Sequence, residues 1–399
     1  MTSGIGGSNA AIELGSLSHW DKPASPISRD ERLGRIEKAR RLTRDAGADA
    51  LLVGAGASLR YFTGVPWGAT ERLVAMLLPV SGAPIIICPA FELGTLKADL
   101  SLDADVRLWE EDESPSALVA QAMREMGGGR LAVDPAIAFV LADRIAKAAP
   151  GLDLIDASPI VDGCRMIKSP AELALMQQAK DMTLEVQRRA ASILEEGIKA
   201  SAVRRFIDEA HRALGASGSS FCIVQFGRST AFPHGLPGDD VLREGDMVLI
   251  DTGCTVQGYH SDITRTYVFG QADDDQRRIW ALEQEAQQAA FDAVKPGAPC
   301  ETVDAAARAV LERAGLGPGY KLPGLPHRTG HGIGLSIHEA AYLVRGDITP
   351  LSPGMCFSNE PMIVVPDRFG IRLEDHFHVT ETGAQWFTAP SPAIDRPFA

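Results

Sequence analysis

The sequence predicts two folded domains, an α/β domain followed by an α+β domain, and three observations support this fold class. The 399 residues suffice for two to three domains, and an apolar content of 45% allows sizeable cores. Short apolar runs alternate with helical stretches as far as about residue 155, which is typical of an α/β domain with a mixed sheet. Beyond residue 168, long helices come first and a strand-rich segment comes last, which favours an α+β domain.

The first domain is expected at residues 28–160, behind an arm at 1–27 that is rich in Gly, Ser and Pro and should be loosely held. The segment Ser28-Arg29-Asp30-Glu31 indicates a capping box, so a helix should run to about residue 46, before Gly47. Apolar runs predict buried strands at 50–53, 73–78, 85–88, 131–133 and 152–155, and helices are expected near 91–100, 116–126 and 137–148.

The second domain is expected at residues 161–399. A second capping box, Ser169-Pro170-Ala171-Glu172, should open a long helix that ends near residue 194. Further helices are predicted near 202–214, 274–294 and 302–314, strands at 221–226 and 248–251, and a strand-rich segment from 355 onward. No internal repeat is evident in this half of the chain.

Charge and composition argue against several classes of partner. A formal net charge of -13 disfavours nucleic acid and anionic membranes, and no apolar run approaches the ~18 residues of a membrane span. The N-terminus lacks the basic and apolar regions of a signal peptide. Six scattered cysteines without a CxxC motif predict buried free thiols, and we expect a cytoplasmic protein. These cysteines are Cys88, Cys164, Cys222, Cys254, Cys300 and Cys356.

The chain is organised around residues 247–268. An apolar run ends in Asp251, Thr252-Gly253 turns the chain, and a second alternating run carries Asp262 and closes on Val268. These runs predict the two strands of a hairpin. Because the two carboxylates would converge and repel each other, the pair needs a shared proton or a cation.

Three further candidate ligands follow downstream. His331 lies in the Gly-rich stretch 330–334, Glu360 follows the apolar run 355–357, and Glu374 ends a strand-like run. Four carboxylates and one imidazole form an oxygen-rich set that suits Mn²⁺ or a related divalent ion better than structural zinc. Five such ligands are more than one open catalytic site needs, and they suit two metals roughly 3.5–4 Å apart.

The order Asp, Asp, His, Glu, Glu and the motifs IDTG, GYHSDITRT, GHGIGLSIHE and GIRLED resemble the pita-bread metallopeptidases, most closely the Xaa-Pro dipeptidases (prolidases). The resemblance spans nearly the whole chain. It implies a creatinase-like α/β N-terminal domain and an α+β pita-bread catalytic domain that hydrolyses the Xaa-Pro bond of dipeptides. The proline amide has no N–H for ordinary peptidases to recognise, which explains why a specialist exists.

The resemblance also implies the roles of the five ligands. Asp262 and Glu374 would bridge two divalent metals, Asp251 would complete one site, and His331 with Glu360 would complete the other. A hydroxide held between the cations would attack the scissile carbonyl, and Glu360 would carry a proton to the leaving nitrogen. Mn²⁺ is the favoured ion, with Co²⁺ and Zn²⁺ as alternatives.

Three histidines and two arginines complete the candidate site. His234 and His338 match family positions that hydrogen-bond the substrate or stabilise the tetrahedral intermediate, although each alone would fit a structural histidine. His327 is expected beside His331 and the substrate. Arg372 and Arg345 are candidates for binding the substrate's terminal carboxylate, because a guanidinium bonds a carboxylate bidentately; either could instead be a solvated surface charge.

Some questions stay open from the sequence. Aminopeptidase P, which takes longer Xaa-Pro peptides, is the nearest alternative, followed by creatinase-like hydrolases or lyases and a non-catalytic binding module of the same fold. Met362 and Val364 stand where many relatives carry Gly and Tyr, so the pocket wall loses a phenol hydroxyl. The resemblance further implies a homodimer, in which the loop-like stretch 61–72 with Tyr61, Trp67 and Arg72 could approach the partner's site.

Overall fold

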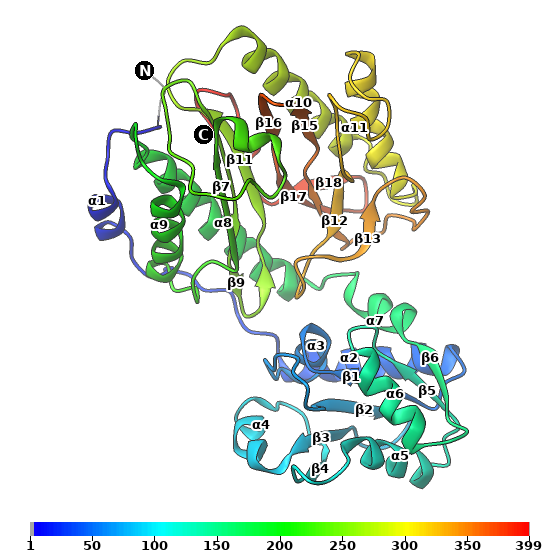
Figure 1. Cartoon of the computed structure of the whole chain (residues 1–399). Coiled ribbons are helices and arrows are strands. Elements are labelled where there is room, and N and C mark those ends of the chain that lie inside the picture. The colour runs from blue at the N-terminus through cyan, green and yellow to red at the C-terminus, as the bar shows by residue number, and fades with distance from the viewer. Residues whose placement is uncertain (1–3, 399) are drawn as a thin grey trace. The chain divides into compact units, whose positions relative to one another are not determined.

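The computed structural model describes residues 4–398, and the chain divides into two compact units (Figure 1). The N-terminal unit is Pro26–Arg165, and the C-terminal unit joins the arm up to Ser25 to everything from Met166 onward. These divisions lie beside the predicted boundaries at 27/28 and 160/161. The last helix before the division, α7 at Ser158–Arg165, belongs to the N-terminal unit.

The N-terminal unit is an α/β domain around a six-stranded mixed sheet with strand order β4-β3-β2-β1-β5-β6. The strands are β1 Ala50–Gly54, β2 Ala75–Pro79, β3 Ile85–Pro89, β4 Asp105–Trp109, β5 Arg130–Val133 and β6 Asp153–Asp156. The longer helices are α2 Arg29–Asp45, α5 Pro115–Glu125 and α6 Phe139–Ala148, with shorter ones at α3 Ala57–Thr63 and α4 Leu93–Asp99. Strand β4 was not predicted, because it is a largely exposed edge strand that carries Asp105 and Arg107.

Tyr61 corrects one expectation for this unit. The sequence placed it in a loop, but it lies in α3 and is buried. Its hydroxyl donates to the carbonyl of Cys164 at 2.8 Å, and the guanidinium of Arg35 lies 4.0 Å from its ring centroid. Tyr61 is therefore a core residue of its own unit, because an aromatic ring with a satisfied hydroxyl is best buried. The approach of Trp67 and Arg72 to a partner stays a prediction.

The C-terminal unit is α+β, with long helices flanking two antiparallel sheets (Figure 1). The helices are α8 Pro170–Ser192, α9 Ala200–Ala213, α10 Asp274–Asp292 and α11 Glu301–Arg313. One sheet has the order β11-β8-β7, with β7 Phe221–Phe226, β8 Met247–Gly253 and β11 Ile263–Val268. The other has the order β13-β12-β14-β17-β18, with β12 Gly330–Gly332, β13 Glu339–Leu343, β14 Cys356–Asn359, β17 Asp375–Val379 and β18 Ala384–Trp386. Two small hairpins pair β9 Thr255–Val256 with β10 Tyr259–His260 and β15 Met362–Val365 with β16 Phe369–Arg372.

The C-terminal unit contains an internal structural repeat that the sequence did not reveal. In each half two helices precede three antiparallel strands, ordered β7-β8-β11 in the first half and β12-β14-β17 in the second. Gly197 and Gly297 lie in the turns that follow the first helix of each half, each five residues after the helix ends, with φ of 90° and 85°. Their amides donate to the carbonyls of Leu242 and Leu351 at 2.9 and 2.8 Å. The repeat lies mainly in the backbone, and matching residues such as Gly197 and Gly297 are too few for the sequence alone to reveal it.

The N-terminal arm also differs from expectation, because residues 4–25 pack on the C-terminal unit. They form the short helix α1 at Ala10–Gly15, and the amides of Gly6 and Trp20 donate to carbonyls on α8 and just after α9. Glu13 pairs with Arg189 at 2.7 Å. A Gly-, Ser- and Pro-rich composition predicts a lack of regular structure, but it does not prevent docking by backbone hydrogen bonds.

All six cysteines lie in the described part of the chain and are free, and all but Cys222 are fully buried. The prediction of free thiols is thereby confirmed. Between residues 4 and 398, no helix combines the length and the apolar character that crossing a bilayer requires.

A fully buried ion pair joins the two sheets of the C-terminal unit. Nη2 of Arg265 lies 2.7 Å from Oδ1 of Asp375, and neither side chain is exposed. Arg265 also donates to the backbone carbonyl of Glu374 at 2.9 Å, and Thr388 donates to Asp375. The pair therefore holds β11 against β17 at the start of β17, immediately after Glu374.

We expect Arg265→Met to lower the free energy of unfolding of chelator-treated protein by about 3–5 kcal/mol, because it leaves Asp375 charged and unpaired in the core. Arg277→Ala is the control. It breaks an ion pair with Asp395 whose side chains are 43% and 42% exposed, and should cost under about 1 kcal/mol. Urea titration measures both values, and equal losses in the two variants would contradict the assigned role of the buried pair.

Candidate metal centre

A cavity of about 520 Å³ in the C-terminal unit gathers every predicted site residue except Arg345. The five predicted ligands come from both halves of the unit. Its lining residues are Phe221, Ile223, Pro233, His234, Asp251, Asp262, Pro326, His327, Arg328, His331, Ile337, His338, Glu360, Arg372 and Glu374.

The predicted pairing of two strands is present, but the predicted turn is wrong: Thr252 and Gly253 belong to β8, and the chain reverses between β9 and β10. Strands β8 and β11 are antiparallel, with Asp251 opposite Thr264. Asp262 lies immediately before β11, after the small β9–β10 hairpin. In the second half, Glu360 follows β14 and Glu374 lies between β16 and β17.

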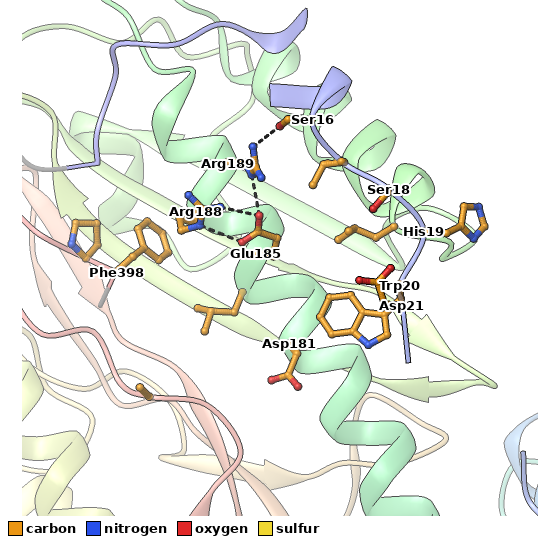
Figure 2. Close-up of a pocket in the computed structure, with 15 residues that line it drawn as sticks. Ser16, Ser18, His19, Trp20, Asp21, Asp181, Glu185, Arg188, Arg189 and Phe398 are labelled. Carbon is orange, nitrogen blue, oxygen red and sulfur yellow. Dashed lines mark hydrogen bonds and ion pairs between the residues drawn. The ribbon is translucent and has the colours of Figure 1, made fainter. Parts of the chain in front are cut away.

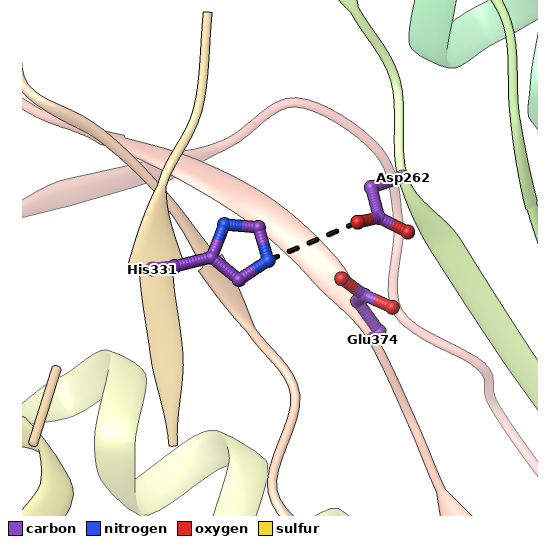
Figure 3. A group of neighbouring side chains, drawn as sticks. All are labelled: Asp262, His331 and Glu374. Carbon is purple, nitrogen blue, oxygen red and sulfur yellow. Dashed lines mark ion pairs between the residues drawn. The ribbon is translucent and has the colours of Figure 1, made fainter. Parts of the chain in front are cut away.

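Three of the predicted ligands form one tight cluster. Asp262, His331 and Glu374 each offer a ligand atom within 4.8 Å of the others, and all three are buried (Figure 3). Figure 3 shows the imidazole of His331 directed at the two carboxylates. Such convergence of oxygen and imidazole ligands in a buried site is the arrangement that a divalent cation requires.

The orientation of His331 is set by its backbone. Its Nδ1 lies 3.0 Å from the carbonyl of Gly332, which can only accept, so Nδ1 carries the proton. In the neutral ring, Nε2 then presents its lone pair 3.2 Å from Oε1 of Glu360 and 3.8 Å from Oδ2 of Asp262. A lone pair facing two carboxylates is repulsive unless a proton or a cation lies between them.

The electrostatics of the carboxylates lead to the same conclusion. Burial, together with the charges of neighbouring acids, raises the pKa of both Asp262 and Glu374 well above the ordinary range. Burial opposes the ionisation of Glu360 as well, and only when His331 carries a second proton at Nε2 do its hydrogen bond and its charge lower the pKa of Glu360 to about 2. Without a cation, this site cannot carry all its negative charges at neutral pH at low cost.

Three carboxylate oxygens in the site are buried and have no hydrogen-bond partner among residues 4–398. They are Oδ1 of Asp251, Oδ1 of Asp262 and Oε1 of Glu374. A buried oxygen of this kind costs free energy unless something coordinates it. The donor set therefore fits divalent cations, with coordination sites open on three of the four carboxylates.

Arg372 lies in the cavity but is held by the ligands themselves. Its Nη2 lies 2.5 Å from Oδ2 of Asp251, and its Nε donates to the hydroxyl of Thr264 at 3.0 Å. Thr264 in turn donates to Oε2 of Glu374 at 2.7 Å. The guanidinium that the sequence suggested for the substrate carboxylate is thus engaged with Asp251.

Arg345 is not brought to this cavity, which contradicts its expected role in binding the substrate. It lies beyond β13 and lines a separate cavity of about 370 Å³ over α11, together with Glu301, Asp304, Arg308 and Glu312. The sequence placed it correctly in a loop, but the direction of a loop side chain depends on packing that spacing alone does not specify.

The three histidines do line the cavity. The ring of His338 lies 4.2 Å from that of His331, and burial followed by the charge of His331 lowers its pKa to about 4. His327 donates from Nδ1 to the carbonyl of Arg328 at 2.7 Å, and burial lowers its pKa. His234 lies in the turn after the short helix at Gly227–Ala231.

Sequence reasoning missed the apolar wall of the cavity and one positively charged residue, an arginine. Phe221 and Ile223 lie two residues apart on β7 and line the cavity from one face, a spacing that strand alternation could have revealed. Arg328 is half-buried with its guanidinium 4.4 Å from the ring centroid of Tyr342. Within the described chain, no carboxylate forms an ion pair with Arg328.

A slightly larger cavity, of about 570 Å³, lies between the arm, α8 and the C-terminal segment (Figure 2). It contains none of the predicted site residues. Its arginines Arg188 and Arg189 are both paired with Glu185 at 2.7 Å. The chemistry of the ligand set therefore lies in the smaller cavity.

Comparison with known families agrees with this geometry. The sequence profile of metallopeptidase family M24 matches residues 174–381, and that of the creatinase/prolidase N-terminal domain matches residues 35–167. The chain belongs to metallopeptidase family M24. The predicted fold class, a creatinase-like domain followed by a pita-bread domain, is confirmed, and so is the prediction of a metallopeptidase.

Relatives of this M24 chain match over most of their length. The probable dipeptidase PepE of Mycobacterium tuberculosis is 39% identical over 88% of this chain and 92% of its own. The crystal structure of dipeptidase PepE from Mycobacterium ulcerans superposes with a TM-score of 0.85 at 38% identity, covering 92% of this chain and 97% of its own. The crystal structure of a prolidase from Thermococcus sibiricus superposes with a TM-score of 0.82 at 30% identity. It covers 92% of this chain and 98% of its own.

Metal binding should stabilise the chelator-stripped M24 chain by about 2.7 kcal/mol when Mn²⁺ is present at about a hundred times its Kd. Asp262→Asn should lose most of that gain. Without metal at pH 8, this variant should melt above wild type, because ionising an acid of raised pKa costs stability as the pH rises through that pKa. Thermal melts with and without Mn²⁺ measure both effects.

The control for this prediction is Asp367→Asn, which alters an ion pair with Arg228 on the surface, where the Asp367 side chain is 81% exposed. It should respond to Mn²⁺ as wild type does. An unchanged Mn²⁺ response in Asp262→Asn would show that Asp262 holds no metal.

Proposed function

We propose that this chain hydrolyses the Xaa-Pro bond of dipeptides in a metal-dependent reaction. The observation that carries the proposal is the convergence of four carboxylates and one imidazole on a single cavity, with three buried oxygens open for coordination. Relatives named dipeptidase and prolidase match nearly their full length and support the substrate class.

Two divalent ions would be held by Asp251, Asp262, His331, Glu360 and Glu374. Their oxygen-rich chemistry favours Mn²⁺, with Co²⁺ or Zn²⁺ as alternatives. When bound, two such ions supply a water of lowered pKa and polarise the scissile carbonyl.

The chain's own acid–base group is Glu360. Its side chain is 16% exposed at the cavity wall, and the hydroxyl of Ser358 donates to its Oε1 at 3.1 Å. In the proposed reaction Glu360 would accept a proton from the attacking water at a carboxylate oxygen and deliver it to the proline nitrogen as the C–N bond breaks. His338 and His234 face the same cavity and would donate hydrogen bonds to the carbonyl oxygen as negative charge develops there.

The substrate's free carboxylate is assigned to Arg328. Arg372 uses its Nη2 and Nε on Asp251 and Thr264, so its role is to orient Asp251. Arg328 has no carboxylate partner within residues 4–398, and its guanidinium is stacked on Tyr342. The apolar side chains Phe221 and Ile223 would hold the pyrrolidine ring.

We further propose a homodimer that works in the cytoplasm. The free cysteines are consistent with a reducing compartment, since none is paired. The dimer rests on the resemblance alone, and gel filtration with light scattering at micromolar concentration tests it.

The reaction is tested with Mn²⁺-reconstituted protein on matched Xaa-Pro dipeptides and Xaa-Pro-Xaa tripeptides. We expect cleavage of the dipeptides. Arg328→Met should raise KM for dipeptides by about ten- to a hundredfold with kcat largely retained, because a charged hydrogen bond contributes about 1.5–3 kcal/mol.

Arg345→Met is the matched control and should behave as wild type, because Arg345 lies in another cavity. Cleavage of tripeptides at a comparable rate would instead assign the chain to aminopeptidase P. Metal binding without hydrolysis of either peptide would reject the substrate class while leaving the metal centre in place.

A further inference from the structure

Two buried glutamines occupy matching positions in the two halves of the C-terminal unit. Gln187 lies in α8, which ends at Ser192, and Gln287 lies in α10, which ends at Asp292. Their exposed fractions are 0% and 2%. Each helix packs on the strands that carry one pair of the proposed metal ligands.

Gln187 joins the two strands of the first half. Its Nε2 donates to the carbonyl of Ile250 at 3.0 Å and to the carbonyl of Ile263 at 2.9 Å. Ile250 immediately precedes Asp251, and Ile263 immediately follows Asp262. One amide group therefore contacts the backbone next to both carboxylates of that half.

Gln287 makes the corresponding contacts in the second half. Its Nε2 lies 3.3 Å from the carbonyl of Asn359 and 3.1 Å from that of Leu373, the residues immediately before Glu360 and Glu374. Oδ2 of Asp375 lies 3.2 Å from the same nitrogen, so the two N–H groups of Gln287 are shared among three acceptors. The side chain of Asn359 donates back to the backbone carbonyl of Gln287 at 2.9 Å.

The two sets of carbonyls are equivalent in strand register. Thr252, two residues after Ile250, is paired with Ile263 across β8 and β11. In the second sheet Asn359 is paired with Asp375. When the same antiparallel register is continued by two residues, the second residue after Asn359 lies opposite Leu373. Both glutamines thus bridge the same two points of the repeat.

We propose that Gln187 and Gln287 are paired positioning residues, each of which fixes the separation of two metal-binding carboxylates: Asp251 and Asp262 for the first, Glu360 and Glu374 for the second. The inference rests on the proposed metal centre and adds the element that holds its geometry. Neither glutamine lines the cavity, so each acts through the backbone of the ligands.

The chemistry of the amide explains why glutamine stands at both positions. Among uncharged side chains, the amide NH₂ group is the one that can donate to two carbonyl oxygens from a single atom, since it carries two N–H donors. The paired carboxylates repel each other and push their strands apart, whereas a shared donor buried between the strands opposes that separation. Oε1 of Gln187 has no hydrogen-bond partner within residues 4–398. All hydrogen bonds of this side chain are therefore donated by its Nε2.

The test is Gln187→Met and Gln287→Met in the full chain, with Mn²⁺ titrated calorimetrically into chelator-stripped protein. Both substitutions keep the length of the side chain and remove its donors. We expect the affinity for Mn²⁺ to fall about ten- to a hundredfold in each, the usual effect of losing a group that orients metal ligands. At saturating Mn²⁺, KM for the dipeptide should be unchanged, because neither side chain contacts the cavity.

The matched control is Gln288→Met, on the same helix, where the side chain is exposed and donates to Asp292 at 2.8 Å. It should bind Mn²⁺ as wild type does. A merely structural role for the buried glutamines would lower the melting temperature of the metal-free protein and leave the Kd for Mn²⁺ unchanged, and that result would overturn the inference.

If a Met variant fails to fold, Gln187→Asn or Gln287→Asn takes its place in the same titration. Asn keeps the two donors but withdraws them by one methylene, so Mn²⁺ binding should still be weaker than in the wild type. Wild-type affinity in the Asn variant would then overturn the inference. If the wild-type protein binds Mn²⁺ but cleaves no Xaa-Pro peptide, the proposed substrate is rejected. The proposed role of the two glutamines in metal binding would still stand.

Discussion

Mutual repulsion among buried carboxylates is the constraint on which the C-terminal unit depends. Asp251, Asp262, Glu360 and Glu374 converge on one cavity, and three of their oxygens have no partner in residues 4–398. Removed from water, such charges are costly unless cations neutralise them. The sheets, the buried Arg265–Asp375 pair and the hydrogen bonds around the ligands all hold these groups together against that cost.

Each half of the internal repeat holds one pair of these carboxylates in place. In both halves a helix, a left-handed glycine and three antiparallel strands deliver a pair of carboxylates to the shared cavity. The halves differ where the chemistry differs, since β12 supplies His331 and the first half supplies the apolar wall of Phe221 and Ile223. The shared cavity therefore takes its four carboxylates equally from the two halves.

The sequence predicted most of the fold and the ligand set, because these depend on local patterns. Capping boxes at Ser28 and Ser169 marked helix starts correctly, and the order of Asp, Asp, His, Glu and Glu identified residues that do converge. The failures concern tertiary packing. Arg345 points to another cavity and Tyr61 is a core residue. The docking of the arm and the internal repeat both depend on backbone contacts that side-chain patterns do not encode.

The most direct test of this account is a crystal structure of the Mn²⁺-loaded protein with anomalous data collected at the manganese edge. The account predicts two anomalous peaks roughly 3.5–4 Å apart, with oxygens of Asp262 and Glu374 between them and Nε2 of His331 bound to one. A single peak, or none within the cavity while peaks appear elsewhere, would contradict the dinuclear centre on which the proposed reaction rests.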